Sequence, residues 1–404
     1  MNSGLLVNVN MPFYIFYSRC VFVYLFLFQI IFNFFIADLP TIISLIVMGP
    51  VNSLFLLLGS LACTYTIKLI PKDLLYVLFF SIYAILSAFI AVLFLEYDYR
   101  VFLLYFEIGS NFFIYYFTGR MLFYDGRWVE RNIEFILSFI KPVSLMIFFL
   151  LAIKGDIAAI LGFGSGDGDS SYLTLSDLFL FYSSIGVYYL FKSKQYFWLF
   201  FIILIQALMY SRTSFICLVA GSVIYLFWVV FWSNIRVFFS LVILVSLPVL
   251  LFAIFKTEMT SLLKDFRHLG WLVDRSLTTS LSSREDLLFV GALYLKNNYI
   301  FGNILWQLEH FNHTGKYIHN VMSYWLQYGI IGFCFLIYFA TKSAFAVLFL
   351  KNTNVKYFAI LLIAFLLELL ISRSFAYPYV WMVFGIIIGL SKVNVKKGSV
   401  YENL

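Results

Sequence analysis

Apolar segments long enough to cross a membrane recur along this chain from Phe13 to Leu390. An α-helix needs about 20 mostly apolar residues to span the hydrocarbon core of a bilayer. The chain is 63% hydrophobic and 12% charged, with a mean hydropathy of +0.96, which is far outside the range of soluble domains. A transmembrane β-barrel would show alternating segments of about ten residues, and runs such as Leu361–Ile371 do not alternate. We therefore predict an all-α fold, a polytopic transmembrane helical bundle.

The apolar pattern predicts about twelve spans in two groups. The predicted ranges are 13–37, 41–67, 74–95, 101–118, 133–153, 176–191, 196–211, 213–232, 236–255, 321–341, 357–372 and 376–391. Residues 1–255 hold the first nine spans, and residues 321–404 hold the last three with a C-terminal tail. The long polar segment 256–320 lies between them, and we predict that it forms one large loop containing short helices.

Basic residues fall on alternate loops, and cytoplasmic loops of membrane proteins carry the excess of lysine and arginine. This alternation predicts that both termini are cytoplasmic and that the large loop lies on the outer, periplasmic side. We expect the first apolar stretch to be retained, because it lacks the short core of a cleavable signal peptide. The predicted cytoplasmic loops hold 14 of the 27 basic residues: Lys68, Lys72, Arg120, Arg127, Arg131, Lys192, Lys194, Arg236, Lys342, Lys351, Lys356, Lys392, Lys396 and Lys397.

The remaining composition argues against metal, disulfide and nucleic-acid chemistry. All four cysteines lie in apolar spans, so no disulfide framework is indicated. A metal cluster around Glu309, His310, His313 and His319 is an alternative, but these histidines have no i, i+4 pair on a helix. The formal net charge of +7 is spread over many short loops, so topology explains it better than a nucleic-acid partner.

Two arginines stand at the predicted outer ends of apolar spans, where a charge is costly and often functional. Arg212 opens a span almost directly after the preceding one ends at Tyr210. The alternative interpretation is that it extends to lipid headgroups. Arg373 lies at the same predicted level, with Glu368 about a turn and a half below it. For this pair the alternative is an ion pair inside the bundle.

Arg284 lies in the polar segment at a predicted helix start. Ser282 or Ser283 would be the N-cap, and Glu285 or Asp286 would complete a capping box, so Arg284 would lie in the first turn. A helix N-terminus suits a phosphate group. An arginine there opposes the helix dipole, which favours an anionic partner. The alternative is a solvated arginine paired with Glu285 or Asp286.

His319 directly precedes the apolar run 321–339, so we expect it at the same depth as Arg212 and Arg373. A histidine with an ordinary pKa can accept a proton from a hydroxyl group near neutral pH. The alternative is that His319 only anchors the end of the span. Four acidic residues of the large loop are alternative bases: Asp265, Asp274, Glu285 and Asp286.

Together these features resemble the bacterial O-antigen polymerase and O-antigen ligase family. The resemblance covers residues 210–339 and the number of spans. It departs from the family where Thr213-Ser214 stand in place of the small residues that often follow the Ser-Arg pair. The segments that carry it are Ser211-Arg212, Arg284 followed by Tyr299-Ile300-Phe301-Gly302-Asn303, His319-Asn320, and Gln327-Tyr328-Gly329-Ile330-Ile331-Gly332.

The resemblance implies a GT-C-type glycosyltransferase of the bacterial inner membrane. It would act at the periplasmic face on undecaprenyl-diphosphate-linked oligosaccharide, without a nucleotide sugar, a metal or another cofactor. It implies that Arg212 and Arg284 bind the diphosphate and that His319 is catalytic, and we add Arg373 as a weaker third clamp. The expected partners are this lipid-linked substrate, membrane lipid and a chain-length regulator protein.

Three functions remain open from the sequence. A polymerase would extend a lipid-linked repeat unit, whereas a ligase would move the finished glycan onto lipid A core. The high content of phenylalanine and tyrosine, 50 and 29 residues, favours the polymerase. A flippase or secondary transporter would instead show broken helices, charges near the bilayer midplane and related halves. The candidate charges cluster at one predicted surface, with Glu107 as the main exception.

Overall fold

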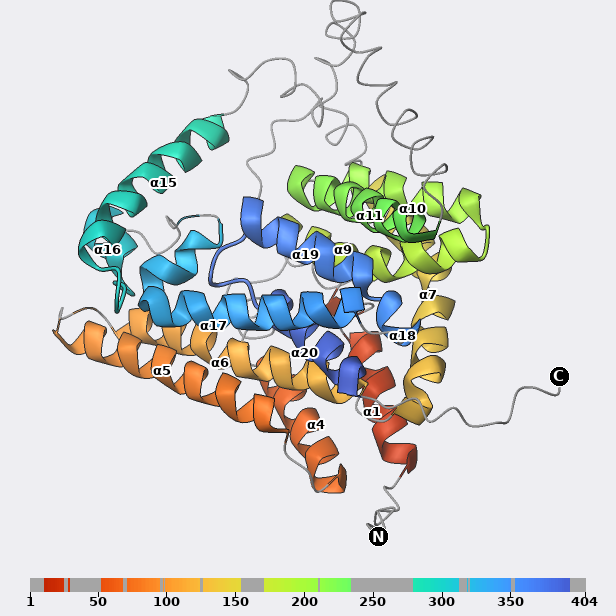
Figure 1. The fold of residues 1–404 in the computed structure, drawn as a ribbon, viewed down its shortest axis with the longest axis horizontal. Coiled ribbons are helices and arrows are strands. Elements are labelled where there is room, and N and C mark those ends of the chain that lie inside the picture. The colour runs from red at the N-terminus through yellow and green to blue at the C-terminus, as the bar shows by residue number, and fades with distance from the viewer. Residues whose placement is uncertain are drawn as a thin grey trace, which may run out of the picture.

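The computed structural model describes residues 11–24, 28–29, 52–67, 71–94, 97, 99–123, 126–153, 171–209, 211–233, 279–311, 318, 320–349 and 353–392. Within these ranges every regular element is a helix, which confirms the all-α prediction (Figure 1). The helices are α1 (Met11–Val23), α4 (Asn52–Ile67), α5 (Lys72–Phe94), α6 (Tyr99–Leu122), α7 (Gly126–Ile153), α9 (Ser171–Lys192), α10 (Tyr196–Leu208), α11 (Arg212–Ser233), α15 (Thr279–Asn297), α16 (Trp306–Phe311), α17 (Met322–Phe349), α18 (Thr353–Lys356), α19 (Ala359–Ile371) and α20 (Tyr379–Lys392).

Helices occupy eleven of the twelve ranges predicted as spans, and the range 236–255 lies outside the described residues. Among the described helices, four segments are long and apolar enough to cross a membrane: Lys72–Phe94, Val101–Leu122, Glu134–Leu151 and Met322–Phe349. Shorter apolar helices of 10–17 residues accompany them. This content is compatible with a membrane protein, while the number of spans stays a prediction.

The helices pack in two groups (Figure 1). In the first group, α6 packs against both α5 and α20, and α17 packs against α5 and α20. In the second group, α9, α10, α11 and α19 pack against one another. Contacts of α19 with α17 and α20 join the two groups, and α15 lies at one end of the first group beside α17.

Glycines allow close approach between helices of the same group. A Cβ atom on Gly119 of α6 would clash with the carbonyl of Met382 on α20, and one on Gly385 would clash with the carbonyl of Tyr116. Small residues let helix backbones approach closely where hydrophobic exclusion from water cannot drive packing. The apolar sequences of α6 and α20 are therefore held together at these two glycines.

A buried ion cluster joins the start of α5 to the ends of α6 and α20. The Asp73 carboxylate accepts hydrogen bonds from Arg120 Nε at 3.1 Å and from Tyr116 Oη at 2.6 Å, and it also contacts Lys392 Nζ. Asp73 and Arg120 are almost completely buried. The contact agrees with the predicted alternation of loops, which put Arg120 and Lys392 on one side.

Helix α17 is kinked at Gly329, where φ is +65°. The N–H of Ile330 donates to the carbonyls of Tyr299 and Ile300 at 3.0 and 3.1 Å. Gly302 has a φ of +72°, and a Cβ atom on either glycine would clash with backbone of the other segment. Both positions favour glycine because L-residues rarely adopt this conformation. Two segments that carry the family resemblance, 299–303 and 327–332, therefore pack together.

Candidate functional site

A buried charged cluster lies where α9, α11 and α19 meet. Ser214 Oγ of α11 donates to Glu368 Oε1 of α19 at 2.6 Å and lies 3.1 Å from Asp177 Oδ1 of α9. Tyr377 Oη donates to Glu368 Oε2 at 2.9 Å. Arg373 Nη2 contacts Asp177 Oδ1 and lies 3.3 Å from Glu368 Oε1. The Arg373 guanidinium thus lies between two carboxylates in the interior, where a charge without a partner would be costly.

This cluster holds the first turn of α11. Ser211 is the N-cap residue, because its Oγ accepts a hydrogen bond from the Ser214 N–H at 3.3 Å and lies 2.8 Å from Ser214 Oγ. Arg212 is the first residue of α11, as the sequence predicted, and its side chain lies outside the described residues. Ser214 therefore has a role: it anchors the turn that carries Arg212 to Asp177 and Glu368.

Arg373 is an ion-pair residue in this structure. Its pairing with Glu368 was the alternative interpretation of the sequence, and its second partner, Asp177, was not predicted. Its side chain is 11% exposed. Its Nε is buried and has no hydrogen-bond partner among the described residues. A signal for Asp177 was present, since an acidic residue just inside an apolar span is costly and commonly paired.

The start of α17 is attached to the same region. Asn320 caps the helix by accepting a hydrogen bond from the Met322 N–H at 2.9 Å. Ser323 Oγ accepts a hydrogen bond from the Phe375 N–H at 2.8 Å, two residues beyond Arg373. His319 itself lies outside the described residues. The first turn of α17, which follows His319 in the sequence, is therefore joined through Ser323 to the segment that carries Arg373.

Helix α15 packs beside the residue that precedes His319. Ile318 is buried, and its side chain fills the space where Gly291 of α15 lacks a Cβ atom. Trp306 and Leu326 complete this small apolar cluster. The helix that carries Arg284 therefore contacts the chain directly next to His319.

The predicted start of the Arg284 helix is wrong. Helix α15 begins at Thr279, so Arg284 lies in its second turn. Several Ser and Thr residues precede Arg284, and each of them is a suitable N-cap, so the sequence pattern did not select one. The argument that Arg284 stands among the free N–H groups of a helix start therefore fails. Its side chain, like those of Glu285 and Asp286, lies outside the described residues, as do Asp265 and Asp274.

Buried amide side chains attach segment 327–332, which carries part of the family resemblance, to the helical core. Gln307 of α16 contacts Gln327 of α17 and the Tyr105 hydroxyl of α6. All three residues are almost completely buried. Polar groups in the interior need such partners, so Gln327 fixes α16 and its neighbours against the bundle.

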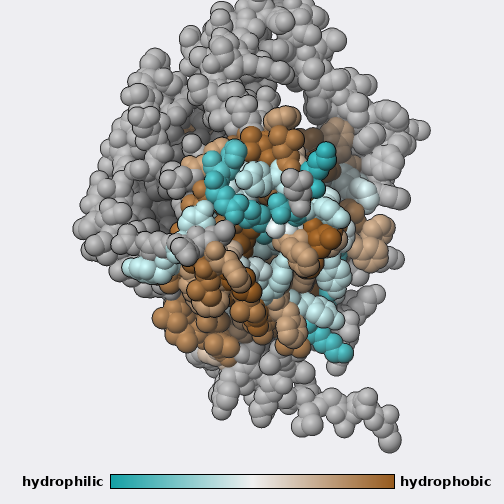
Figure 2. Space-filling view, turned by 90° about the vertical axis from the view of Figure 1, so that its left-hand side faces the viewer, coloured by the Kyte–Doolittle hydropathy of each residue, from teal (hydrophilic) through white to brown (hydrophobic). Residues whose placement is uncertain are grey.

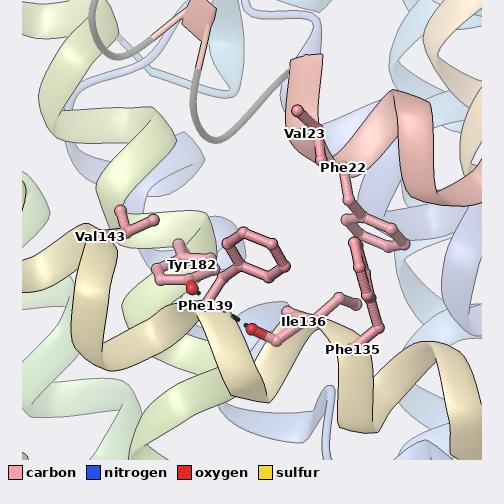
Figure 3. A pocket seen from close by; sticks show the side chains of 7 residues that line it. All are labelled: Phe22, Val23, Phe135, Ile136, Phe139, Val143 and Tyr182. Atoms are coloured by element: carbon pink, nitrogen blue, oxygen red, sulfur yellow. Dashed lines mark hydrogen bonds between the residues drawn. The ribbon is translucent and has the colours of Figure 1, made fainter.

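The described ranges also contain an apolar pocket, but no group of side chains that would hold a metal ion. Within the described ranges, no group of three or more His, Cys, Asp and Glu side chains could hold a metal ion, and His313 and His319 lie outside them. An apolar pocket lies between α1, α7 and α9 (Figure 3), and its lining residues are Phe22, Val23, Phe135, Ile136, Phe139, Val143 and Tyr182. This lining carries no charge, so it does not suit a diphosphate.

Compared with known proteins, the chain matches no protein-family model and no curated protein sequence. The resemblance to O-antigen polymerases and ligases therefore depends on the residues quoted above.

Proposed function

We propose that the protein is an O-antigen polymerase, a metal-independent glycosyltransferase of the bacterial inner membrane. It transfers a growing glycan from undecaprenyl diphosphate to a lipid-linked repeat unit at the periplasmic leaflet. In this proposal the twelve predicted spans hold the site at the outer face, with both termini in the cytoplasm. A chain-length regulator is a further proposed partner.

One observation carries the proposal: a continuous set of contacts links the segments around the three predicted site residues. The turn that begins with Ser211 and Arg212 is hydrogen-bonded through Ser214 to Glu368. The segment after Glu368 reaches the start of α17 through Phe375 and Ser323, four residues beyond His319. Packing of Gly291 on Ile318 then links this region to α15. Residues 212, 284 and 319, distant in sequence, thus belong to adjoining segments.

The proposed chemistry needs cations beside the leaving group and a base beside the acceptor. Arg212 and Arg284 bind the diphosphate, since guanidinium groups bind phosphate oxygens in a bidentate manner and stabilise the developing charge. The bond between the donor sugar carbon and the phosphate oxygen breaks, and the acceptor oxygen bonds to that carbon. His319 takes the acceptor proton, and the lipid diphosphate leaves as an anion.

Arg373 has a smaller role in binding the diphosphate. Its Nη2 is engaged by two carboxylates, so only the rest of its guanidinium is available for a phosphate oxygen. Its main contribution is to form ion pairs with Asp177 and Glu368, and these two carboxylates contact the turn that carries Arg212. It remains a weaker third clamp.

A lipid-linked oligosaccharide flippase or secondary transporter is the second candidate, and two observations favour it. Helix α17 is interrupted at Gly329, and the Asp177–Arg373–Glu368 cluster is buried within the bundle. Interrupted helices and buried charges are features of carriers. The ligase remains a further alternative, because it would use the same donor and the same arginines.

Elongation by the purified protein tests the proposal. In vesicles that contain lipid-linked repeat units, with lipid A core as a second acceptor, the protein should produce a ladder of longer lipid-linked glycans without another enzyme. Arg212→Ala and Arg284→Ala should abolish the ladder, while Lys194→Ala, which removes an exposed cation of the α9–α10 turn, should keep it. Transport of the substrate without elongation would support the carrier, and transfer only to lipid A core would support the ligase. Normal ladders from both arginine variants would contradict the assigned site.

A further inference from the structure

We propose that α15 is a membrane-interface helix whose outward face lies in lipid. The sequence places it in a polar loop, yet residues Leu287–Lys296 form one of the apolar helices of the structure. This inference about α15 does not depend on the proposed function. It concerns where the helix lies, and therefore what surrounds the segment that carries Arg284.

The apolar side chains of α15 lie on two opposite faces. One face, which includes Val290, Gly291 and Tyr294, packs on Ile318 and the small cluster around Trp306. A helix of a soluble loop would present polar residues on its other face. Residues 287–295 of α15 are apolar on both faces, and a helical segment of this kind is buried in protein or lies in lipid.

The outward face of α15 is apolar and exposed. Leu288, Phe289 and Leu293 are exposed, and Phe289 retains 67% of its accessible surface. The exposed residue that follows them on this face is Lys296, in the last turn. A long basic side chain beside an apolar face suits the boundary between acyl chains and phosphate headgroups. The composition of this face therefore matches a bilayer surface.

The outward face continues into other exposed apolar surface, which identifies lipid as the occupant. Tyr299, Ile300 and Phe301 follow α15 and are exposed, with Phe301 at 72%. The carbonyls of Tyr299 and Ile300 accept a hydrogen bond from the kink of α17, a helix long and apolar enough to cross a membrane. Figure 2 views this end of the molecule and shows hydrophobic residues both above and below a central group of hydrophilic ones. A bilayer that surrounds α17 would therefore also meet α15.

The position of α15 bears on substrate binding, in a step that rests on the proposed function. Residue 284 precedes Gly291 by seven residues, which is about 10 Å along the helix axis. An interfacial helix lies about 5–10 Å into the boundary between headgroups and acyl chains. Arg284 is then carried at the depth where a lipid-linked diphosphate lies, without leaving the bilayer surface.

Site-directed fluorescence in vesicles tests the lipid contact. Single cysteines replace Phe289 and Phe79 in a variant that lacks the four native cysteines, and each is labelled with an environment-sensitive fluorophore. Phe79 is the matched control, because it is also 67% exposed and lies in the apolar helix α5. Ser193→Cys, in the exposed α9–α10 turn, is the aqueous control. The vesicles contain phospholipids with brominated acyl chains, and iodide, the water-soluble quencher, is present at the same concentration on both sides of the membrane.

We expect brominated lipid to quench the label at residue 289 as strongly as the label at residue 79, with little quenching by iodide. Quenching by iodide at the level of residue 193 would place α15 in water and overturn the proposal. Protection from both quenchers would show that protein covers the face, which would also overturn it. Lipid quenching in a protein that fails to elongate glycans would keep this inference and reject the proposed function.

Discussion

At the residue scale, the account depends on pairs of polar groups that are far apart in the sequence. Arg373 and Asp177 are separated by 196 positions, and Ser214 and Glu368 by 154. Each charge could be recognised as unusual from its apolar surroundings. The partner could not be recognised, because pairing depends on how α9, α11 and α19 pack. The arginine positions were thus predictable, whereas the acids that balance Arg373 were only partly so.

Removal of Glu368 should destabilise the protein strongly. Glu368→Ala leaves Arg373 with one carboxylate, removes the acceptor of the Tyr377 hydroxyl, and leaves Ser214 with only its more distant acceptor, Asp177. Arg373 keeps Asp177 as its partner, so the main cost is a buried donor left without an acceptor, which is about 1–3 kcal/mol. The measurement is thermal unfolding in detergent with Glu134→Ala as control, because Glu134 is an exposed carboxylate of α7. Equal unfolding temperatures for the two variants would contradict the structural role of the cluster.

At the element scale, the helices follow from the apolar runs, but their ends and interruptions do not. The runs predicted helices in eleven ranges that the structure describes as helical. The start of α15 was predicted four or five residues too late, because several Ser and Thr residues before Arg284 are acceptable N-caps. The kink of α17 was not predicted, because a glycine within an apolar run does not by itself indicate a positive φ. The kink depends on segment 299–303, which packs against it.

Alanine at the kink of α17 should be poorly tolerated. Gly329→Ala forces a residue with a Cβ atom into a positive φ, at a cost of about 1–3 kcal/mol, and the new atom also clashes with the carbonyl of Ile300. Gly186→Ala is the control, since its new Cβ meets only the flexible end of Ile140. Thermal unfolding of the two variants should differ clearly. A Gly329→Ala protein as stable as the control would contradict the kink.

At the scale of the whole molecule, composition and the alternation of charged loops predicted a membrane-embedded helical bundle. The cluster of Asp73, Arg120 and Lys392 agrees with that alternation, since it joins segments predicted to lie on one side. The packing of α15 against the bundle was not predictable, because its apolar residues 287–295 lie between polar residues in the sequence. Segment 256–320 stays a prediction as one loop, and the structure describes residues 279–311, 318 and 320 of it.

Two single-cysteine variants, each made in a protein that lacks the native cysteines, test the predicted orientation. Lys296→Cys, at the exposed end of α15, should react with a membrane-impermeant maleimide in spheroplasts. Ser193→Cys, in the exposed turn after α9, should react only after permeabilisation. This outcome follows from the loop alternation, which puts residue 193 in the cytoplasm. Reaction of both cysteines in intact spheroplasts would contradict the topology.

The central claim is that a lipid-linked diphosphate binds at the outer face between Arg212 and Arg284, beside His319. A cryo-electron microscopy map of the protein with undecaprenyl-diphosphate-linked oligosaccharide tests it most directly. The account predicts diphosphate density in contact with both guanidinium groups and a sugar hydroxyl near the His319 imidazole. Diphosphate density away from these arginines, or Arg212 and Arg284 at opposite faces of the membrane, would contradict it.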